Sequence, residues 1–218
     1  MELTHGQLRD FIRSIHDRPN GTGALLNLVR ASEVRAAAEL SCLADVILDD
    51  QLRLDVTRHA ADEARHAHLL VRRMGEIGFA PSRLPPAVDR TEAVIAQCRA
   101  RDVKQVWNER GTFTDEEILE LLVAAAIAER DALPKLQANH DVLERDPHTQ
   151  SVIGSILRDE HRHVEYLDAW VECFERRVSA EVVRATRARL EAAFDTANVA
   201  FYAAFGEYLQ SAAARLAA

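Results

Sequence analysis

Apolar residues recur every three or four positions along nearly the whole chain, which is the period of an amphipathic α-helix. No run of alternating apolar and polar residues between turn signals, as a half-buried β-strand requires, interrupts this pattern. The pattern therefore predicts an all-α fold.

Turn and capping residues divide the pattern into separate helices. The segment Pro19-Asn20-Gly21-Thr22-Gly23 is expected to break the chain, and Gly75 and Gly78 to stop a helix. Thr114 opens a capping box, and Asp146 is an N-cap followed by a proline. The predicted helices cover about 3–16, 24–48, 50–75, 89–108, 115–144 (with a kink at Pro134), 147–176 and 179–215.

These helices predict a single domain over residues 1–218. Two helical hairpins over about 24–176 form a four-helix bundle, with a long crossover between the second and third bundle helices. A short N-terminal helix precedes the bundle, and a fifth long helix, about 179–215, follows it.

Composition and charge exclude several classes of protein. The net charge of −8 argues against a nucleic-acid partner. No apolar run is long enough to span a membrane and no leader pattern opens the chain, so we expect a cytoplasmic protein. The three cysteines form no Cys-x-x-Cys pair and are expected to be buried packing residues.

A pentapeptide occurs twice, 97 residues apart, as Asp62-Glu63-Ala64-Arg65-His66 and Asp159-Glu160-His161-Arg162-His163. Glu and His three positions apart on a helix project from one face and can meet the same metal ion. In both helices this pair lies on the apolar stripe that should face the core. Burying a carboxylate there is costly unless a cation compensates, so the two pairs indicate a shared metal site.

The other two bundle helices each supply a carboxylate at a matching height. Glu33 precedes Glu63 by 30 residues and Glu129 precedes Glu160 by 31, a spacing that brings side chains level in a helical hairpin. Glu39 is an alternative to Glu33, but it lies off the apolar stripe.

These residues resemble the ligand set of the ferritin-like di-iron carboxylate superfamily, which reads Glu, Glu-x-x-His, Glu, Glu-x-x-His. The resemblance covers about residues 24–176 and implies two iron ions, or a manganese–iron pair. Carboxylate and imidazole ligands suit these metals, whereas the absence of thiolates disfavours copper(I) and structural zinc. The implied ligands are Glu33 and Glu129 (terminal), Glu63 and Glu160 (bridging or chelating), and His66 and His163 (one on each iron).

Three further residues flank this set. His59, one turn before Glu63, resembles an additional ligand of arylamine N-oxygenases in the same superfamily; the alternative is a core histidine bonded to a carboxylate. In the family, an aspartate at the position of Asp62 and Asp159 often accepts a hydrogen bond from a ligand histidine. The alternative for these two aspartates is a salt-bridged helix surface.

The fold hosts several activities, so the reaction has to be inferred from departures around the site. The fifth helix does not suit an iron-storage ferritin, and a rubrerythrin-like peroxide reductase usually brings a rubredoxin module that is absent from this sequence. Leu70 and Leu167 stand where the radical subunit of ribonucleotide reductase has its tyrosine, and Tyr166 is off that register. We therefore expect a di-iron oxidase or oxygenase, with a peroxide reductase or iron-handling protein as the alternative.

The expected partners follow from that reading: O2 or peroxide, a small organic substrate to be hydroxylated, N-oxygenated or desaturated, and an external reductase as electron donor. Alanine runs beside Glu33 and Glu129 leave room for substrate, or simply allow close helix packing. An aromatic stripe on the last helix, Phe194, Phe201, Phe205 and Tyr208, is expected to pack on the bundle or on a second subunit in a homodimer.

Overall fold

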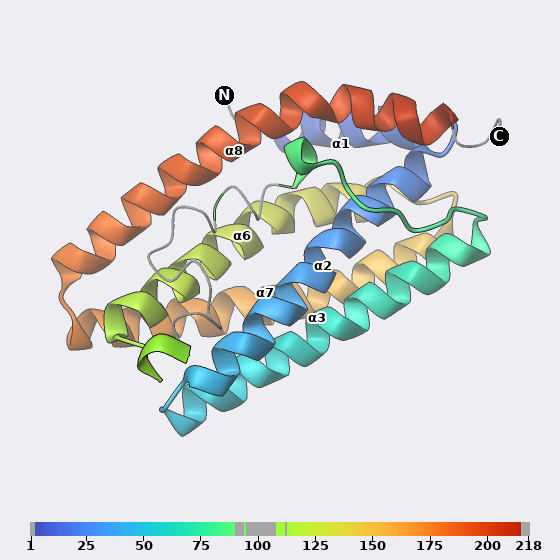
Figure 1. Ribbon diagram of the computed structural model, residues 1–218. Coiled ribbons are helices and arrows are strands. Elements are labelled where there is room, and N and C mark those ends of the chain that lie inside the picture. The colour runs from blue at the N-terminus through green and yellow to red at the C-terminus, as the bar shows by residue number, and fades with distance from the viewer. Residues whose placement is uncertain (1–2, 90–93, 95–107, 112, 215–218) are drawn as a thin grey trace.

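The computed structural model describes residues 3–89, 94, 108–111 and 113–214. These residues form seven helices and no strand. The helix predicted over 89–108 lies almost entirely outside the described residues. The helices are α1 (His5–His16), α2 (Gly21–Val46), α3 (Asp50–Glu76), the 3-10 helix η1 (Pro86–Val88), α6 (Asp115–Val142), α7 (Pro147–Arg177) and α8 (Ala180–Ala214) (Figure 1).

The predicted caps set most of these boundaries. The Thr114 side chain accepts from the backbone N–H of Glu117, whose carboxylate accepts from the backbone of Thr114, so the capping box is confirmed. Asp146 accepts from the backbone of Thr149 at the start of α7, and Gly78 follows α3 with φ +73°. Pro134 lies inside α6, which continues past it to Val142.

The predicted break at residues 19–23 is wrong at its C-terminal end, because α2 already begins at Gly21. The turn covers residues 17–20 and ends at Asn20, which has φ 59°. Gly21 and Gly23 allow the start of α2 to pack closely against groups outside this helix. A Cβ on Gly21 would lie 1.7 Å from the Ile15 carbonyl oxygen, and one on Gly23 would lie 2.2 Å from the Phe79 ring.

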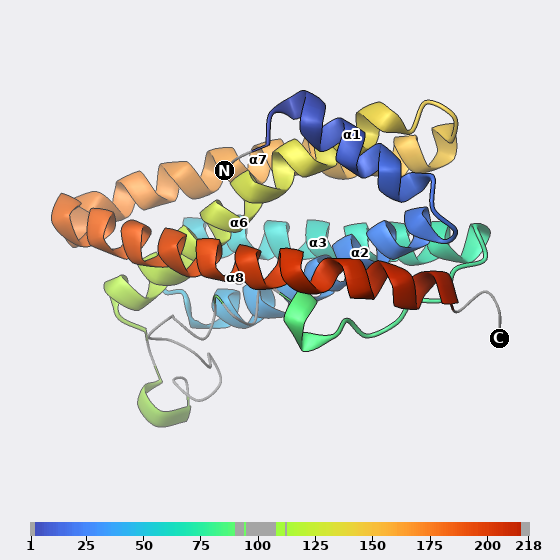
Figure 2. The ribbon, with the colours of Figure 1, turned by 90° about the horizontal axis from the view of Figure 1, so that it is seen from above.

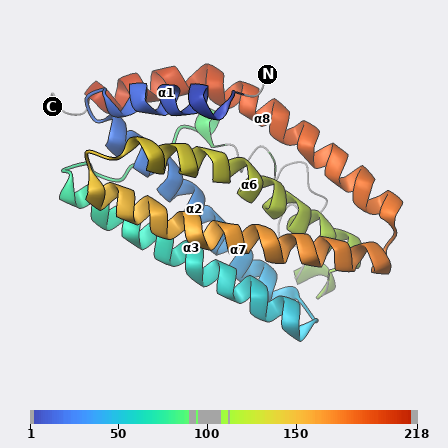
Figure 3. The same ribbon diagram turned by 180° about the vertical axis from the view of Figure 1, so that it is seen from behind.

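Two helical hairpins, α2–α3 and α6–α7, form the core of the molecule. Seen from behind, α3 and α7 lie side by side on the face opposite α8 (Figure 3). On the other face α2 and α6 make almost no direct contact, and α8 lies along the gap between them (Figure 2). α1 packs against α6.

Two apolar clusters fill the two ends of the bundle. One contains Leu122 and Phe174, and the other contains Leu70 and Ile153. Burial of each such side chain stabilises the fold by about 1.5–3 kcal/mol. On each of the four bundle helices, the predicted site residues other than His59 fall between the stretches that supply the two clusters. The apolar ends therefore hold the polar middle in a water-poor position.

Other features of the described residues bear on the sequence predictions. Cys42 and Cys173 are half-buried rather than buried, because they lie at the edges of their helices' inward faces; Cys98 is outside the described residues. The α8 stripe is buried against the rest of the chain. Each helix that the structure describes is too short or too polar to span a bilayer.

Candidate metal centre

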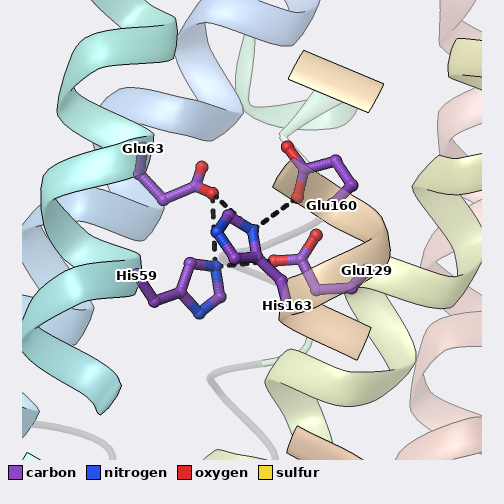
Figure 4. A group of neighbouring side chains, drawn as sticks. All are labelled: His59, Glu63, Glu129, Glu160 and His163. Atoms are coloured by element: carbon purple, nitrogen blue, oxygen red, sulfur yellow. Dashed lines mark hydrogen bonds and ion pairs between the residues drawn. The ribbon is translucent and has the colours of Figure 1, made fainter. Parts of the chain in front are cut away.

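The predicted ligands meet at the middle of the bundle, one or more from each core helix. Figure 4 shows the part of this site that comes from α3, α6 and α7: His59, Glu63, Glu129, Glu160 and His163. The candidate ligand atoms of the whole site form two groups, and within each group all atoms lie within 4.8 Å of one another. Glu63 and Glu160 belong to both groups, so these two carboxylates link them. The first group is His59, Glu63, Glu129, Glu160 and His163; the second is Glu33, Glu63, His66 and Glu160.

These side chains are removed from water. Glu63, His66, Glu160 and His163 are at most 3% exposed, and the most exposed member, Glu129, has 12% of its side chain accessible. Four carboxylates at one level of a protein core would repel one another strongly if all were ionised. The groups can coexist as anions only with protons or cations to compensate them.

Each candidate ligand histidine is oriented by the aspartate of the opposite helix. His66 Nε2 on α3 lies 3.1 Å from Asp159 Oδ2 on α7, and His163 Nε2 on α7 lies 3.5 Å from Asp62 Oδ2 on α3. An Nε2–H that donates to a carboxylate leaves Nδ1 as the ligand atom. In both rings Nδ1 faces the carboxylates, at 3.3 Å from Glu160 Oε1 for His66 and at 2.7 Å from Glu160 Oε2 for His163.

Two arginines hold these aspartates in place. Arg65 donates to Asp62 at 3.1 Å and also to Asp159, and Arg162 donates to Asp62 at 3.2 Å and also to Asp159. Burial alone would raise the pKa of both aspartates, but hydrogen bonds from Arg65 hold both pKa values below the ordinary range. Both aspartates therefore remain anionic acceptors for the histidines.

The candidate ligands of both groups, called the cluster below, include His59, which has a partner that the sequence did not reveal. Its ring stacks on His163 with a centroid distance of 3.7 Å, and its Nε2 lies 3.1 Å from Glu129 Oε1. On the other side, His59 Nδ1 lies 2.7 Å from the hydroxyl of Tyr166. Tyr166 follows His163 by three positions, so its place one turn along the same face was available as a signal.

The pKa values of three carboxyl groups are displaced upward. Burial raises the pKa of Glu33 to about 8 and that of Glu129 to about 7, and the charge of Glu160 adds to both shifts. Burial and the charge of Glu33 hold the pKa of Glu63 well above its ordinary value. Protons on these groups relieve the repulsion when no cation is bound.

The pKa of Glu160 moves the other way. Burial alone would raise it, but hydrogen bonds from His163 and His66 lower it below the ordinary value. For His66, burial alone would lower the pKa, but hydrogen bonding to Glu160 raises it above the ordinary value. Glu160 is therefore the carboxylate that stays ionised at the centre of the cluster.

One atom of the cluster lacks a hydrogen bond. Glu63 Oε1 is fully buried and accepts no hydrogen bond of normal geometry from the described residues. His59 Nε2 and His163 Nδ1 lie near it, at 3.2 and 3.3 Å. An orphaned buried carboxylate oxygen that belongs to both groups is where a cation would be stabilising. The residues therefore fit a bound metal, and oxygen and imidazole donors fit iron or manganese.

The cluster separates two cavities of different character. A cavity of about 290 Å³ reaches Glu33, Glu129 and Glu160 from the side of α2 and α6. A cavity of about 80 Å³ lies on the side of α3 and α7, and polar residues dominate its lining: Asp55, Arg58, His59, Asp62, Arg162, His163 and Tyr166. His59 lines both cavities.

All nine residues singled out from the sequence thus lie in the cluster or in contact with it. The structure also brings in Arg65, Arg162 and Tyr166, whose contacts depend on how α3 packs against α7. Glu39, the alternative to Glu33, is in neither ligand group.

Comparison of the chain with protein-family models, with curated proteins and with solved structures gives no match.

Proposed function

We propose that this protein is a ferritin-like di-iron oxidase or oxygenase that uses O2 and electrons from a separate reductase to oxidise a small organic substrate. The observation that carries the proposal is the pair of ligand groups joined by Glu63 and Glu160, because shared carboxylates of this kind can hold two metal ions close together. A manganese–iron pair is the alternative composition.

Each group would hold one metal ion. Glu33 and His66 belong only to the second group, and Glu129 and His163 only to the first, so each ion has its own carboxylate and imidazole. His59 offers a further nitrogen to the first group. Iron bound there would supply the oxygen-activating redox chemistry that the side chains of the protein lack.

The residues of the chain have three tasks around that chemistry. Asp62 and Asp159 fix the histidine rings so that Nδ1 faces inward. The apolar clusters at either end exclude water from the site. His59, bonded to Tyr166 on one nitrogen and close to Glu129 on the other, can hold a proton at the edge of the cluster.

The large cavity favours an organic substrate over an iron-handling role. It is lined mainly by apolar side chains, and three of the six carboxylates among its lining residues belong to the cluster. A path for hydrated iron would be expected to carry more exposed carboxylates along its length.

The test is metal content and oxygen reactivity. Protein purified without chelator, loaded anaerobically with Fe(II), should bind about two irons per chain and give a transient visible absorption on mixing with O2. Glu63→Ala should lose most of the iron, because both groups share this residue. Glu165→Ala, an exposed glutamate on α7, should load as the wild type does.

Other outcomes would contradict the proposal. Equal iron content in Glu63→Ala and wild type would show that the cluster is not the metal site. Reoxidation by peroxide that is much faster than by O2 would favour the peroxide reductase, and rapid repeated iron oxidation without any substrate would favour iron handling.

A further inference from the structure

The large cavity is elongated. Its lining runs along α2 from Leu25 to Leu43 and along α6 from Leu121 to Asn139. At a rise of 1.5 Å per residue, either stretch extends over about 27 Å. A volume of about 290 Å³ distributed over such a length makes a narrow channel, partly open to solvent, rather than a round enclosed chamber.

The channel has an apolar arm on each side of the cluster. Leu40, Leu121 and Phe194 line the arm toward one end of the bundle. Leu28, Leu136 and Phe205 line the arm toward the other, where α1 lies. Among the described residues that line the two arms, apolar side chains outnumber polar ones.

The cluster faces the middle of the channel. Glu33 lies near the centre of the α2 stretch and Glu129 near the centre of the α6 stretch, and both line the cavity. The acidic and basic residues elsewhere on the described wall are Glu39, Asp89, Asp131 and Lys135. Asp131 pairs with Lys135, and Asp89 pairs with Arg35.

The small side chains and α8 create this space. Ala125 lies one turn before Glu129 and Ala132 nearly one turn after it, and both line the channel. α2 and α6 do not close on each other, and α8 lies over the gap between them (Figure 2). Phe194, Phe201 and Phe205 of α8 line the channel.

We propose that this channel binds a linear hydrocarbon chain, which lies along the bundle with apolar carbons in both arms and presents an internal segment to Glu33 and Glu129. The inference rests on the proposed function in assigning a role to that segment, and it deepens that function by naming the substrate class. An apolar cavity of about 150 Å³ takes up benzene, so one of about twice that volume has room for roughly ten carbon atoms. A narrow shape selects a linear arrangement of those carbons over a compact one.

Three ten-carbon probes test the shape and polarity of the site. The full-length protein is titrated with three compounds: 1-decanol, 1-adamantanol, which has the same number of carbon atoms in a compact cage, and 1,10-decanediol. Binding is followed by calorimetry and by NMR of ¹³C-methyl alanine. We expect 1-decanol to bind at least tenfold more tightly than 1-adamantanol and to shift the methyl signals of Ala125 and Ala132. The diol should bind more weakly than 1-decanol, because one arm must then bury a second hydroxyl.

Two variants test whether both arms are used. Ala125→Phe should block one arm and Ala132→Phe the other, and each should weaken 1-decanol binding at least tenfold. Ala38→Phe, at an exposed position of α2 outside the channel, should leave binding unchanged. Circular dichroism checks that each variant is folded, and Ala125→Leu and Ala132→Leu replace any phenylalanine variant that is not.

Three outcomes would each overturn the inference. The first is that 1-adamantanol binds as tightly as 1-decanol, and the second is that 1,10-decanediol binds more tightly than 1-decanol. The third is that Ala125→Phe or Ala132→Phe leaves the affinity for 1-decanol unchanged. Iron content is measured separately on the same samples. Decanol binding without iron uptake would contradict the proposed function alone, whereas iron uptake without decanol binding would contradict this inference alone.

Discussion

His66 on α3 hydrogen-bonds through Nε2 to Asp159 on α7, 93 positions away, and not to the aspartate of its own pentapeptide. His163 and Asp62 form the reciprocal contact at 3.5 Å. The repeated sequence thus produces an exchange between two helices, in which each supplies a candidate ligand and the orienting aspartate for the other. Because each orienting aspartate lies on the opposite helix, the inward orientation of both Nδ1 atoms depends on how α3 packs against α7.

Asp159→Asn tests this orientation. The amide keeps the shape but removes the charge that stabilises the Nε2–H tautomer of His66, so metal affinity should fall by about 10- to 100-fold. Affinity is measured by competition with a chromophoric chelator. Asp45→Asn, at an exposed position on α2, is the control and should leave affinity unchanged; an unaltered affinity in Asp159→Asn would refute the orienting role.

Tyr166→Phe tests the contact with His59. Loss of the hydroxyl leaves a buried imidazole nitrogen without its partner, which should lower the free energy of unfolding by about 1–3 kcal/mol. Urea denaturation of the metal-free protein measures this change. Iron stoichiometry should remain that of the wild type, since Tyr166 is in neither ligand group; a loss of iron would instead assign it a direct part in binding.

The raised pKa values predict an unusual pH dependence for the metal-free protein. Glu33, with a pKa of about 8, and Glu129, with a pKa of about 7, keep protons in the folded state that the unfolded chain loses near pH 4.5. Their contribution to stability is therefore complete below about pH 4.5 and is lost as the pH rises toward 8. Urea unfolding at pH 5, 6.5 and 8 should show falling stability, and Glu33→Gln should flatten the slope.

Metal should reverse that trend. Binding displaces the protons from these carboxyl groups, so metal affinity should rise between pH 5 and pH 8. The free energy of unfolding of the metal-free protein, measured with chelator present, could instead increase steadily from pH 5 to pH 8. The buried carboxyl groups would then have to be ionised even without a cation.

Removal of metal should also be visible as lost stability. With free metal at 100 times its dissociation constant, binding to the folded state contributes about 2.7 kcal/mol. Addition of chelator should therefore lower the melting temperature of the wild type, while the double variant Glu63→Gln, Glu160→Gln should show no response. Glu165→Gln should respond like the wild type, and an identical response from all three proteins would place the metal elsewhere.

The sequence by itself determined the long helices that the structure describes, most of their caps, and the residues that meet at the centre. Helical period fixes which side chains share a face, and the spacings of 30 and 31 residues fix which carboxylates share a height, so Glu33, Glu63, Glu129 and Glu160 could all be predicted to meet. Capping by Thr114 and Asp146 involves only neighbouring residues, which a local pattern describes fully.

Only the tertiary structure decided the contacts between helices that are distant in sequence. The exchange of Asp62 and Asp159, the bond between His59 and Tyr166, and the channel beneath α8 depend on how α3, α7 and α8 are rotated and offset against one another. Gly23 shows the same limit on a small scale: its glycine pattern indicates a turn, yet the residue lies in α2. Glycine is required there because the Phe79 ring occupies the space of a Cβ. Packing of this kind is set by the sum of many long-range contacts, which the periodicity of a single helix does not record.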